Sequence, residues 1–270
     1  SIFTFRHEWH SDSVHTSSPV VLNESKAAGE VRLAHNQDTG KLSTKEILEL
    51  LNITWISLPD GSSRSRSISK TEVTVKQYKA CIEAGSCQPI PSTFQPSYGQ
   101  CSYQNANDSL PMTCVTFEDA KRFAQWVNQL YLRSLSDQNH ILQTELIVSL
   151  PSYEDWLASI EPNPRPWGHE PPSCQRSVFF ERSPSCIGHL GPQPVCSRPE
   201  GNNANGACDI FGNVWEWVMP HSNSNNLSLL PQTVGGAWSS AAIDLSKDGL
   251  KPRPGHIRNP SVGIRLLYLH

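Results

Sequence analysis

The chain has 270 residues, 37% of them hydrophobic, and a formal net charge of -3. This length can bury the core of one large domain, and the charge is too close to neutral to favour nucleic acid or an anionic membrane surface as a partner. No apolar run approaches the roughly 20 residues that a membrane-spanning helix needs, and no signal peptide begins at Ser1. We therefore expect a soluble domain from which an N-terminal export signal or anchor has been removed.

The first part of the chain is polar and shows no sustained periodicity. We expect an irregular N-terminal arm over residues 1–42 and a single domain over residues 43–270. The sequence STKE at residues 43–46 has the form of a capping box before a short helix at residues 47–51. The β-branched and aromatic residues at 53–56 then favour a strand.

Two longer helices have well-marked starts. Thr74 and Thr116 each place a hydroxyl where it can accept a hydrogen bond from a free helix N–H, with a polar side chain three positions on. We expect these helices over residues 75–84 and 117–130, the first ending before a glycine and the second burying one apolar face. A third, short helix is expected to begin at Ser152.

The cysteines form an even set without the C-x-x-C spacing that is typical of zinc sites. We therefore expect disulfides and an oxidising compartment. Residues 161–209 combine many prolines with four of the cysteines, which favours long disulfide-pinned loops over regular structure. We expect one or two bridges among Cys81, Cys87, Cys101 and Cys114, and two among Cys174, Cys186, Cys196 and Cys208.

The most informative segment is the run DIFGNVWEW at residues 209–217. It combines two acids, two tryptophans and a glycine that lets backbone carbonyls turn inward. This is an oxygen-rich arrangement that suits a hard cation such as calcium. Under the alternative interpretation, the tryptophans are core residues and the acids are merely solvated.

Several separated motifs occur in a characteristic order. They are KTEVTVKQY at residues 70–78, LPMTCVTFEDA at 110–120, LPSYEDW at 150–156, the 209–217 run, GGAW at 235–238 and GIR at 263–265. Together they resemble the formylglycine-generating-enzyme-like family, also called the sulfatase-modifying-factor family. The resemblance covers residues 53–268. It implies an α+β, C-type-lectin-like fold with low regular secondary structure and long disulfide-pinned loops.

The resemblance also implies that the chain binds calcium and that it does not bind copper. It makes the 209–217 run a structural calcium site, formed by the carboxylates of Asp209 and Glu216 and the main-chain oxygens of Gly212 and Val214. The oxidases of the family hold copper through a pair of cysteines just after the Gly-Gly-x-Trp motif. Here Ser240 stands where the first cysteine would be, and no cysteine follows it. We therefore expect neither copper nor formylglycine generation.

By analogy with the family, we then expect the function to depend on an exposed surface that binds a partner. The resemblance places residues 238–259 on an exposed face, whose aromatic, charged and small polar side chains suit a protein partner. We expect a non-catalytic binding or regulatory protein of the bacterial periplasm or outer envelope, similar to relatives that accompany transmembrane kinases and type VI secretion systems. The expected binding residues are Trp238, Ser239, Ser240, Asp244, Lys247, Arg253, His256 and Arg258.

Two other functions remain open. One is a periplasmic oxidoreductase of the pyoverdine-maturation kind, which would show a deep polar pocket beneath Trp238 with a bound metal or a carboxylate of perturbed pKa. The other is a retroelement-diversified ligand-binding protein, whose sister sequences would differ almost solely between Trp238 and Asn259.

Overall fold

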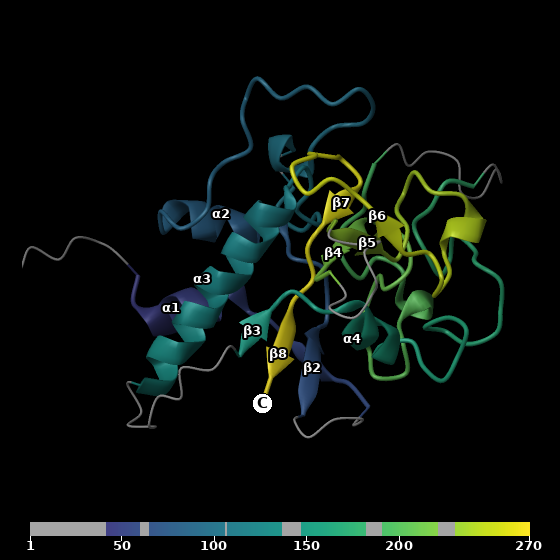
Figure 1. The fold of residues 1–270 in the computed structure, drawn as a ribbon, viewed down its shortest axis with the longest axis horizontal. Helices are drawn as coiled ribbons and strands as arrows, with labels where there is room; N and C mark the ends of the chain where they lie inside the picture. The colour runs from purple at the N-terminus through teal and green to yellow at the C-terminus, as the bar shows by residue number, and fades with distance from the viewer. Residues whose placement is uncertain (1–41, 60–64, 106, 137–146, 182–190, 221–229) are drawn as a thin grey trace, which may run out of the picture. The chain divides into compact units, whose positions relative to one another are not determined.

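The computed structural model describes residues 42–59, 65–105, 107–136, 147–181, 191–220 and 230–270. The predicted arm lies outside these ranges apart from residue 42, and so does Cys186. Within the described part, four helices and two small sheets are joined by long irregular loops (Figure 1). This arrangement confirms the predicted α+β class with low regular secondary structure. No described helix is long and apolar enough to cross a membrane.

The first helix, α1 (Thr44–Leu51), begins at the predicted capping box. The Ser43 hydroxyl accepts a hydrogen bond from the Glu46 N–H, and the Glu46 carboxylate accepts one from the Ser43 N–H at 2.7 Å. These reciprocal bonds satisfy N–H groups that a helix N-terminus leaves free. The helix starts three residues earlier than predicted because the residues of the box already belong to its first turn.

The same device begins two further helices. In α2 (Val75–Glu83), Thr74 and Gln77 bond reciprocally, and in α4 (Tyr153–Ala158) the Ser152 hydroxyl accepts a hydrogen bond from the third residue of the helix. All three starts were predicted from hydroxyl residues followed by polar side chains. Local sequence was sufficient here because a capping box involves only neighbouring residues.

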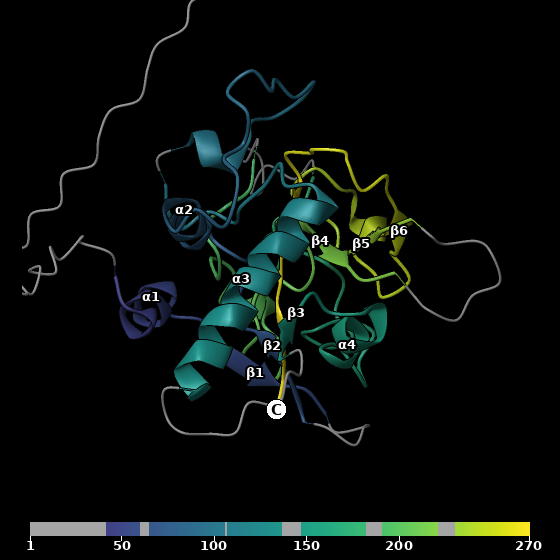
Figure 2. The ribbon, with the colours of Figure 1, turned by 60° about the vertical axis from the view of Figure 1, so that its left-hand side comes forward.

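The longest helix, α3 (Phe117–Ser136), continues six residues beyond its predicted end at Leu130. Tyr131 explains the extension, because its ring still packs against the rest of the domain. The centroid of the Tyr131 ring lies 6.1 Å from that of Trp55 and 5.4 Å from that of Tyr268. Figure 2 shows α3 lying in front of the strands that carry these two residues.

The first sheet has the order β1-β2-β8-β3, and every pair in it is antiparallel. Its strands are β1 (Trp55–Ser57), β2 (Arg66–Ser69), β8 (Leu267–Leu269) and β3 (Val148–Ser149). Because β8 lies between β2 and β3, the last described strand is held beside one of the first. This pairing places the GIR motif, which precedes β8, in the interior.

The second sheet has the order β6-β5-β4-β7. Its strands are β6 (Lys251–Pro252), β5 (Gln232–Val234), β4 (Trp215–Val218) and β7 (Val262–Gly263), with β4 and β7 parallel. The 209–217 run ends in β4, whose four residues are all buried. The tryptophans of the run are therefore core residues, as the alternative interpretation expected.

Three disulfides pin the loops between these elements. They join Cys81 to Cys87, Cys101 to Cys114, and Cys196 to Cys208. Cys174 is disulfide-bonded as well, and no described cysteine is a free thiol. The prediction of one or two bridges among the first four cysteines is confirmed with two, and one of the two predicted among the last four is confirmed as well.

Candidate functional site

The centre of the domain holds a fully buried guanidinium, that of Arg265. Its Nε donates a hydrogen bond to Glu216 Oε1 at 2.8 Å, and Nη2 forms an ion pair with the same oxygen at 2.7 Å. The same group donates to the main-chain oxygens of Ser69, Lys70 and Cys208 at 2.8 to 3.1 Å. A buried charge requires such partners, because water no longer solvates it. The GIR motif therefore supplies the counter-ion of Glu216, a role that the sequence analysis missed.

Two further acids, Glu72 and Asp209, are buried near this ion pair. Glu72 Oε1 accepts a hydrogen bond from Asn213 Nδ2 at 3.1 Å. Burial raises the pKa of Glu72 well above its usual range, and the charge of Asp209 raises that pKa further. Burial also raises the pKa of Asp209 and of Glu216, and the charge of Arg265 opposes both shifts. The charges of Arg265 and Arg198 both lower the pKa of Asp209, whereas the charges of Asp209 and Glu216 raise that of Glu72, so among these acids protonation is most favoured at Glu72.

The predicted calcium ligands lie around the same ion pair. Glu216 Oε1 is bound to the guanidinium, whereas Glu216 Oε2 is buried and completes no hydrogen bond. Asp209 Oδ2 accepts the Cys196 N–H at 2.6 Å. In the part of the chain that the structure describes, no three His, Cys, Asp or Glu side chains are grouped to hold a metal ion. Calcium therefore stays a prediction, and Glu216 Oε2 is the oxygen whose environment suits it.

Gly212 has a steric role that the sequence analysis did not identify. Its φ is +89°, a conformation that other residues rarely adopt, and a Cβ at this position would overlap the main chain of Val178 and the side chain of Ser177. Asn213 N–H donates to Val178 O at 2.8 Å beside it. The glycine therefore allows the 209–217 run to pack directly against residues 177–178.

Ser240, at the position of the expected first cysteine, is only 6% exposed. Its Oγ accepts the Ala237 N–H at 3.0 Å, and its carbonyl accepts the Phe180 N–H at 2.9 Å. Ser240 thus closes the turn that follows the GGAW motif. We predicted this side chain for an exposed binding face, and that prediction is wrong because the turn needs its hydroxyl inside.

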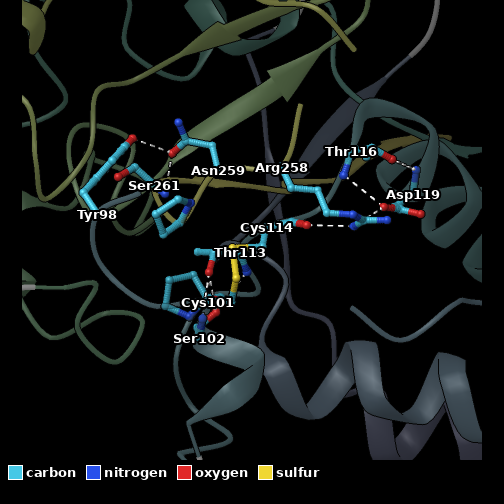
Figure 3. Close-up of a disulfide and its surroundings, with 12 residues drawn as sticks. Tyr98, Cys101, Ser102, Thr113, Cys114, Thr116, Asp119, Arg258, Asn259 and Ser261 are labelled. Atoms are coloured by element: carbon cyan, nitrogen blue, oxygen red, sulfur yellow. Dashed lines mark hydrogen bonds and ion pairs between the residues drawn. A yellow bond between two sulfur atoms is a disulfide. The ribbon is translucent and has the colours of Figure 1, made fainter. Parts of the chain in front are cut away.

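Two charged residues predicted for the binding face are bonded within the domain. Arg258 Nη1 donates to Asp119 Oδ2 at 2.7 Å and to the Cys114 carbonyl at 2.8 Å (Figure 3). Asp244 Oδ1 pairs with Lys251 Nζ at 2.7 Å. These contacts hold the loop between β5 and β7 against the N-terminus of α3 and against itself. Of the other predicted residues, Lys247 and His256 are exposed and Arg253 is half-buried.

Trp238 and Ser239 do reach a common site, because they line a cavity of about 670 Å³. The opposite wall comes from residues 98–102, with Asn105, Leu110 and residues 191–192 completing the described lining. No Asp, Glu, Lys, Arg or His is among these described residues. Apart from Cys101, the sequence analysis missed the wall at residues 98–105, because an irregular loop has no periodicity to mark which side chains point inward.

A disulfide and a set of short hydrogen bonds hold this wall in place (Figure 3). The Cys101–Cys114 bridge ties the wall to the segment that precedes α3. Next to it, the Thr113 hydroxyl accepts the Ser102 N–H at 2.8 Å, and the Ser102 hydroxyl accepts the Thr113 N–H at 2.9 Å. Covalent and reciprocal bonds therefore fix the shape of the wall before any ligand binds.

Two aromatic rings stand at the cavity with their polar atoms already bonded. The Tyr98 hydroxyl donates to Asn259 Oδ1 at 2.9 Å (Figure 3), and Trp238 Nε1 donates to Pro260 O at 3.4 Å. The ring centroids are 6.3 Å apart and the ring planes are tilted by 49°. Because the polar atoms are used internally, the rings can offer a ligand mainly their apolar faces.

The family of the protein follows from its sequence. A family model described as the sulfatase-modifying factor enzyme 1-like domain matches residues 60–268. The chain belongs to this sulfatase-modifying-factor family. The resemblance predicted from six short motifs is thereby confirmed over most of its range. A search of curated proteins found no match.

Solved structures show that this member of the sulfatase-modifying-factor family has a known fold. PvdO from Pseudomonas aeruginosa is 18% identical, with a TM-score of 0.57 over 80% of this chain and 90% of that one. Treponema denticola variable protein 1 is 16% identical, with a TM-score of 0.58 over 80% and 95%. CarF is 17% identical, with a TM-score of 0.57 over 81% and 98%. Identities this low establish a common fold and leave function to the site itself.

Proposed function

We propose that this member of the sulfatase-modifying-factor family is a non-catalytic binding or regulatory protein and that it binds a protein partner at the cavity beside Trp238. The cavity carries the proposal. Its volume of about 670 Å³ lies within the roughly 300–1,000 Å³ that is typical of ligand sites. Tyr98 is 46% exposed at the cavity, and a partly exposed aromatic ring is a common anchor for a protein partner.

The chemistry of the described lining supports binding over catalysis. General acid–base catalysis needs a group that can exchange a proton near the working pH, and copper chemistry in this family needs thiolates. In the described lining, the Cys101 sulfur is in a disulfide and the Tyr98 hydroxyl is hydrogen-bonded. Ser240, which replaces the expected thiol, is buried and serves a turn.

The oxidoreductase alternative predicted a bound metal or a carboxylate of perturbed pKa in the pocket, and the second of these signs can be compared with the structure. The acids whose pKa is raised are Glu72, Asp209 and Glu216, and they gather around Arg265. None of them is among the described residues that line the cavity. The position of these acids therefore favours the binding proposal over the oxidoreductase.

The disulfides support a location in an oxidising compartment, which we propose to be the bacterial periplasm or envelope. Disulfides of this kind persist where thiols are not kept reduced, and here they hold loops that regular structure does not hold. As the partner we propose a protein of the same compartment, in a kinase-regulated or type VI secretion pathway such as the family resemblance suggests.

Filling the cavity tests the proposal directly. A Cβ added at Gly191 would meet no atom within 4 Å, so Gly191→Trp should fold normally while occupying the space that a partner would use. The matched control is Gln125→Trp, which adds the same bulk to an exposed position of α3. We expect the wild type and Gln125→Trp to capture the same protein from a native envelope fraction, and Gly191→Trp to lose it.

Equal capture by all three proteins would show that the cavity is not the binding site. Metal analysis provides an independent check, because copper or iron bound stoichiometrically to the purified wild type would contradict a non-catalytic function. Both measurements use the full chain, and a melting curve for each variant separates lost binding from lost folding.

We also propose calcium as a structural ion of the 209–217 run, held by the carboxylates of Asp209 and Glu216 and the main-chain oxygens of Gly212 and Val214. The support is the burial of these two acids beside a third, Glu72, in the interior of the domain. A bound calcium would compensate part of the excess negative charge around Arg265. Elemental analysis should find calcium in the purified protein, and a chelator should lower its melting temperature. A protein free of calcium and insensitive to the chelator would remove this site.

A further inference from the structure

Two cationic side chains cover one buried indole in the second sheet. Trp215, in β4, is only 3% exposed. Lys251 Nζ lies 4.7 Å from the centroid of its ring, and the guanidinium carbon of Arg253 lies 5.5 Å from it. Figure 1 shows β4, β5 and β6 side by side, so that Lys251 in β6 and Arg253 just after it are brought close to β4. Trp215 is therefore a platform on which these cations are positioned.

The two cations differ in how their charge is compensated. Lys251 pairs with Asp244 at 2.7 Å. Arg253 is held by its main-chain N–H, which donates to Pro231 O at 2.8 Å, and by Nε, which donates to Thr233 Oγ1 at 2.9 Å. Across the described residues, no carboxylate forms an ion pair with Arg253. Its terminal nitrogens, Nη1 and Nη2, donate no hydrogen bond to any residue that the structure describes.

The other well-positioned arginines show what is missing. Arg66 pairs with an aspartate at 2.6 Å, and Arg258 and Arg265 each pair with an acid at 2.7 Å. Charged groups that lose part of their hydration are normally paired in this way, since desolvation is costly. Arg253 is half-buried, and its burial lowers its pKa. Its fork of nitrogen donors is thus ordered, partly desolvated and unused.

We propose that Arg253 binds a carboxylate of the protein partner, with Trp215 holding the guanidinium in place. This proposal rests on the proposed function and adds the chemistry that the partner must present. The Arg253 fork matches a carboxylate, which can accept from both terminal nitrogens at once.

The charged side chains around Arg253 favour a single acidic side chain over a polyanion as the ligand. Lys251 is already paired with Asp244, and exposed Lys247 is followed by exposed Asp248. Nucleic acids and anionic membranes are bound by several uncompensated cations acting together. One ordered guanidinium with no acid of its own instead suits one carboxylate. Arg253 would therefore supply a directional contact to a carboxylate, in addition to the apolar contacts at the cavity.

The test uses a displayed library of random peptides, selected on the wild-type protein. We expect the enriched peptides to contain an acidic residue, and Arg253→Gln to lower their affinity about tenfold or more, the effect of losing hydrogen bonds to a charged group. Replacing the acidic residue of a peptide by its amide should cost the wild type the same factor and cost Arg253→Gln nothing further. Such non-additivity identifies two groups in direct contact.

Three comparisons make this experiment specific. Arg133→Gln removes the same charge from an exposed position on α3 and should leave affinity unchanged. Arg253→Lys keeps the charge and loses the fork, so it should restore only part of the affinity. Inorganic phosphate at the same concentration as the peptide should not displace it, and displacement would identify phosphate as the ligand and overturn the carboxylate assignment.

Several results would contradict the proposal. Enriched peptides without acidic residues would do so, as would a library with no enriched peptide or an acid dependence that persists in Arg253→Gln. If Gly191→Trp abolishes partner capture while Arg253→Gln leaves it unchanged, the cavity is the binding site and the role of Arg253 is refuted. If Gly191→Trp leaves capture unchanged, the proposed function fails on its own experiment.

Discussion

Replacing Arg265 by methionine should be one of the most damaging single changes to this domain. The substitution keeps much of the side-chain volume but removes two contacts to Glu216 and three hydrogen bonds to main-chain carbonyls. Breaking a fully buried ion pair costs about 3–5 kcal/mol, because the remaining charge stays buried without its partner. Domains of this kind are stable by only about 5–15 kcal/mol, so Arg265→Met should lose between about a fifth and all of the free energy of unfolding.

Urea unfolding followed by tryptophan fluorescence at pH 7 measures this loss, because Trp156 and Trp217 are fully buried and report on the core. Lys79→Met is the control, since it breaks a 2.6 Å ion pair to Asp108 whose two side chains are 36% and 52% exposed. An exposed pair is worth roughly 0–1 kcal/mol. Arg265→Lys, which keeps the charge but not the fork, should fall between the two.

A loss below about 1 kcal/mol for Arg265→Met would refute the central role of the Glu216–Arg265 pair. If the methionine variant does not fold at all, Arg265→Lys still provides the comparison. A lysine variant as stable as the wild type would show that the carbonyl contacts of the fork contribute little.

Two further predictions concern buried acids and disulfides. Burial raises the pKa of Glu72 above the ordinary value of 4.5, so the folded state binds this proton more tightly than the unfolded state does. The free energy of unfolding therefore falls as the pH rises from 4.5 through the raised pKa. Glu72→Gln should therefore raise the free energy of unfolding at neutral pH and flatten its dependence on pH above 4.5, and a steeper dependence would contradict the assignment. Replacing both Cys101 and Cys114 by serine should cost about 3 kcal/mol, the value for opening a loop of about 15 residues, and an unchanged melting temperature would contradict it.

The sequence was informative wherever structure depends on neighbouring residues. The capping boxes at Ser43 and Thr74 and the helix start at Ser152 were predicted because the hydrogen bonds that begin these helices span only three positions. The end of α3 was predicted too early because it depends on Tyr131 meeting Trp55 and Tyr268, residues distant in the chain. Local propensity cannot report a contact of that kind.

In the candidate site, too, the sequence identified the motifs but not the contacts between distant residues. The 209–217 run was recognised, but its acid Glu216 was assigned to calcium alone, because the sequence does not show that Arg265 lies 2.7 Å away. Ser240 was identified as the residue that replaces a cysteine, yet its side chain was predicted to be exposed and is buried in a turn. The cavity wall at residues 98–105 carried no motif beyond its cysteine.

The sequence by itself determined the family, the disulfide-rich character and the absence of the copper cysteine pair after the GGAW motif. These properties depend on which residues are present and in what order. Tertiary structure alone decided which charges are neutralised, which rings face a cavity, and that Arg253 lies over Trp215 without an ion pair to any described acid. The reason is physical, because burial and ion pairing are set by distances between segments that folding brings together, and those distances are not encoded in any local pattern.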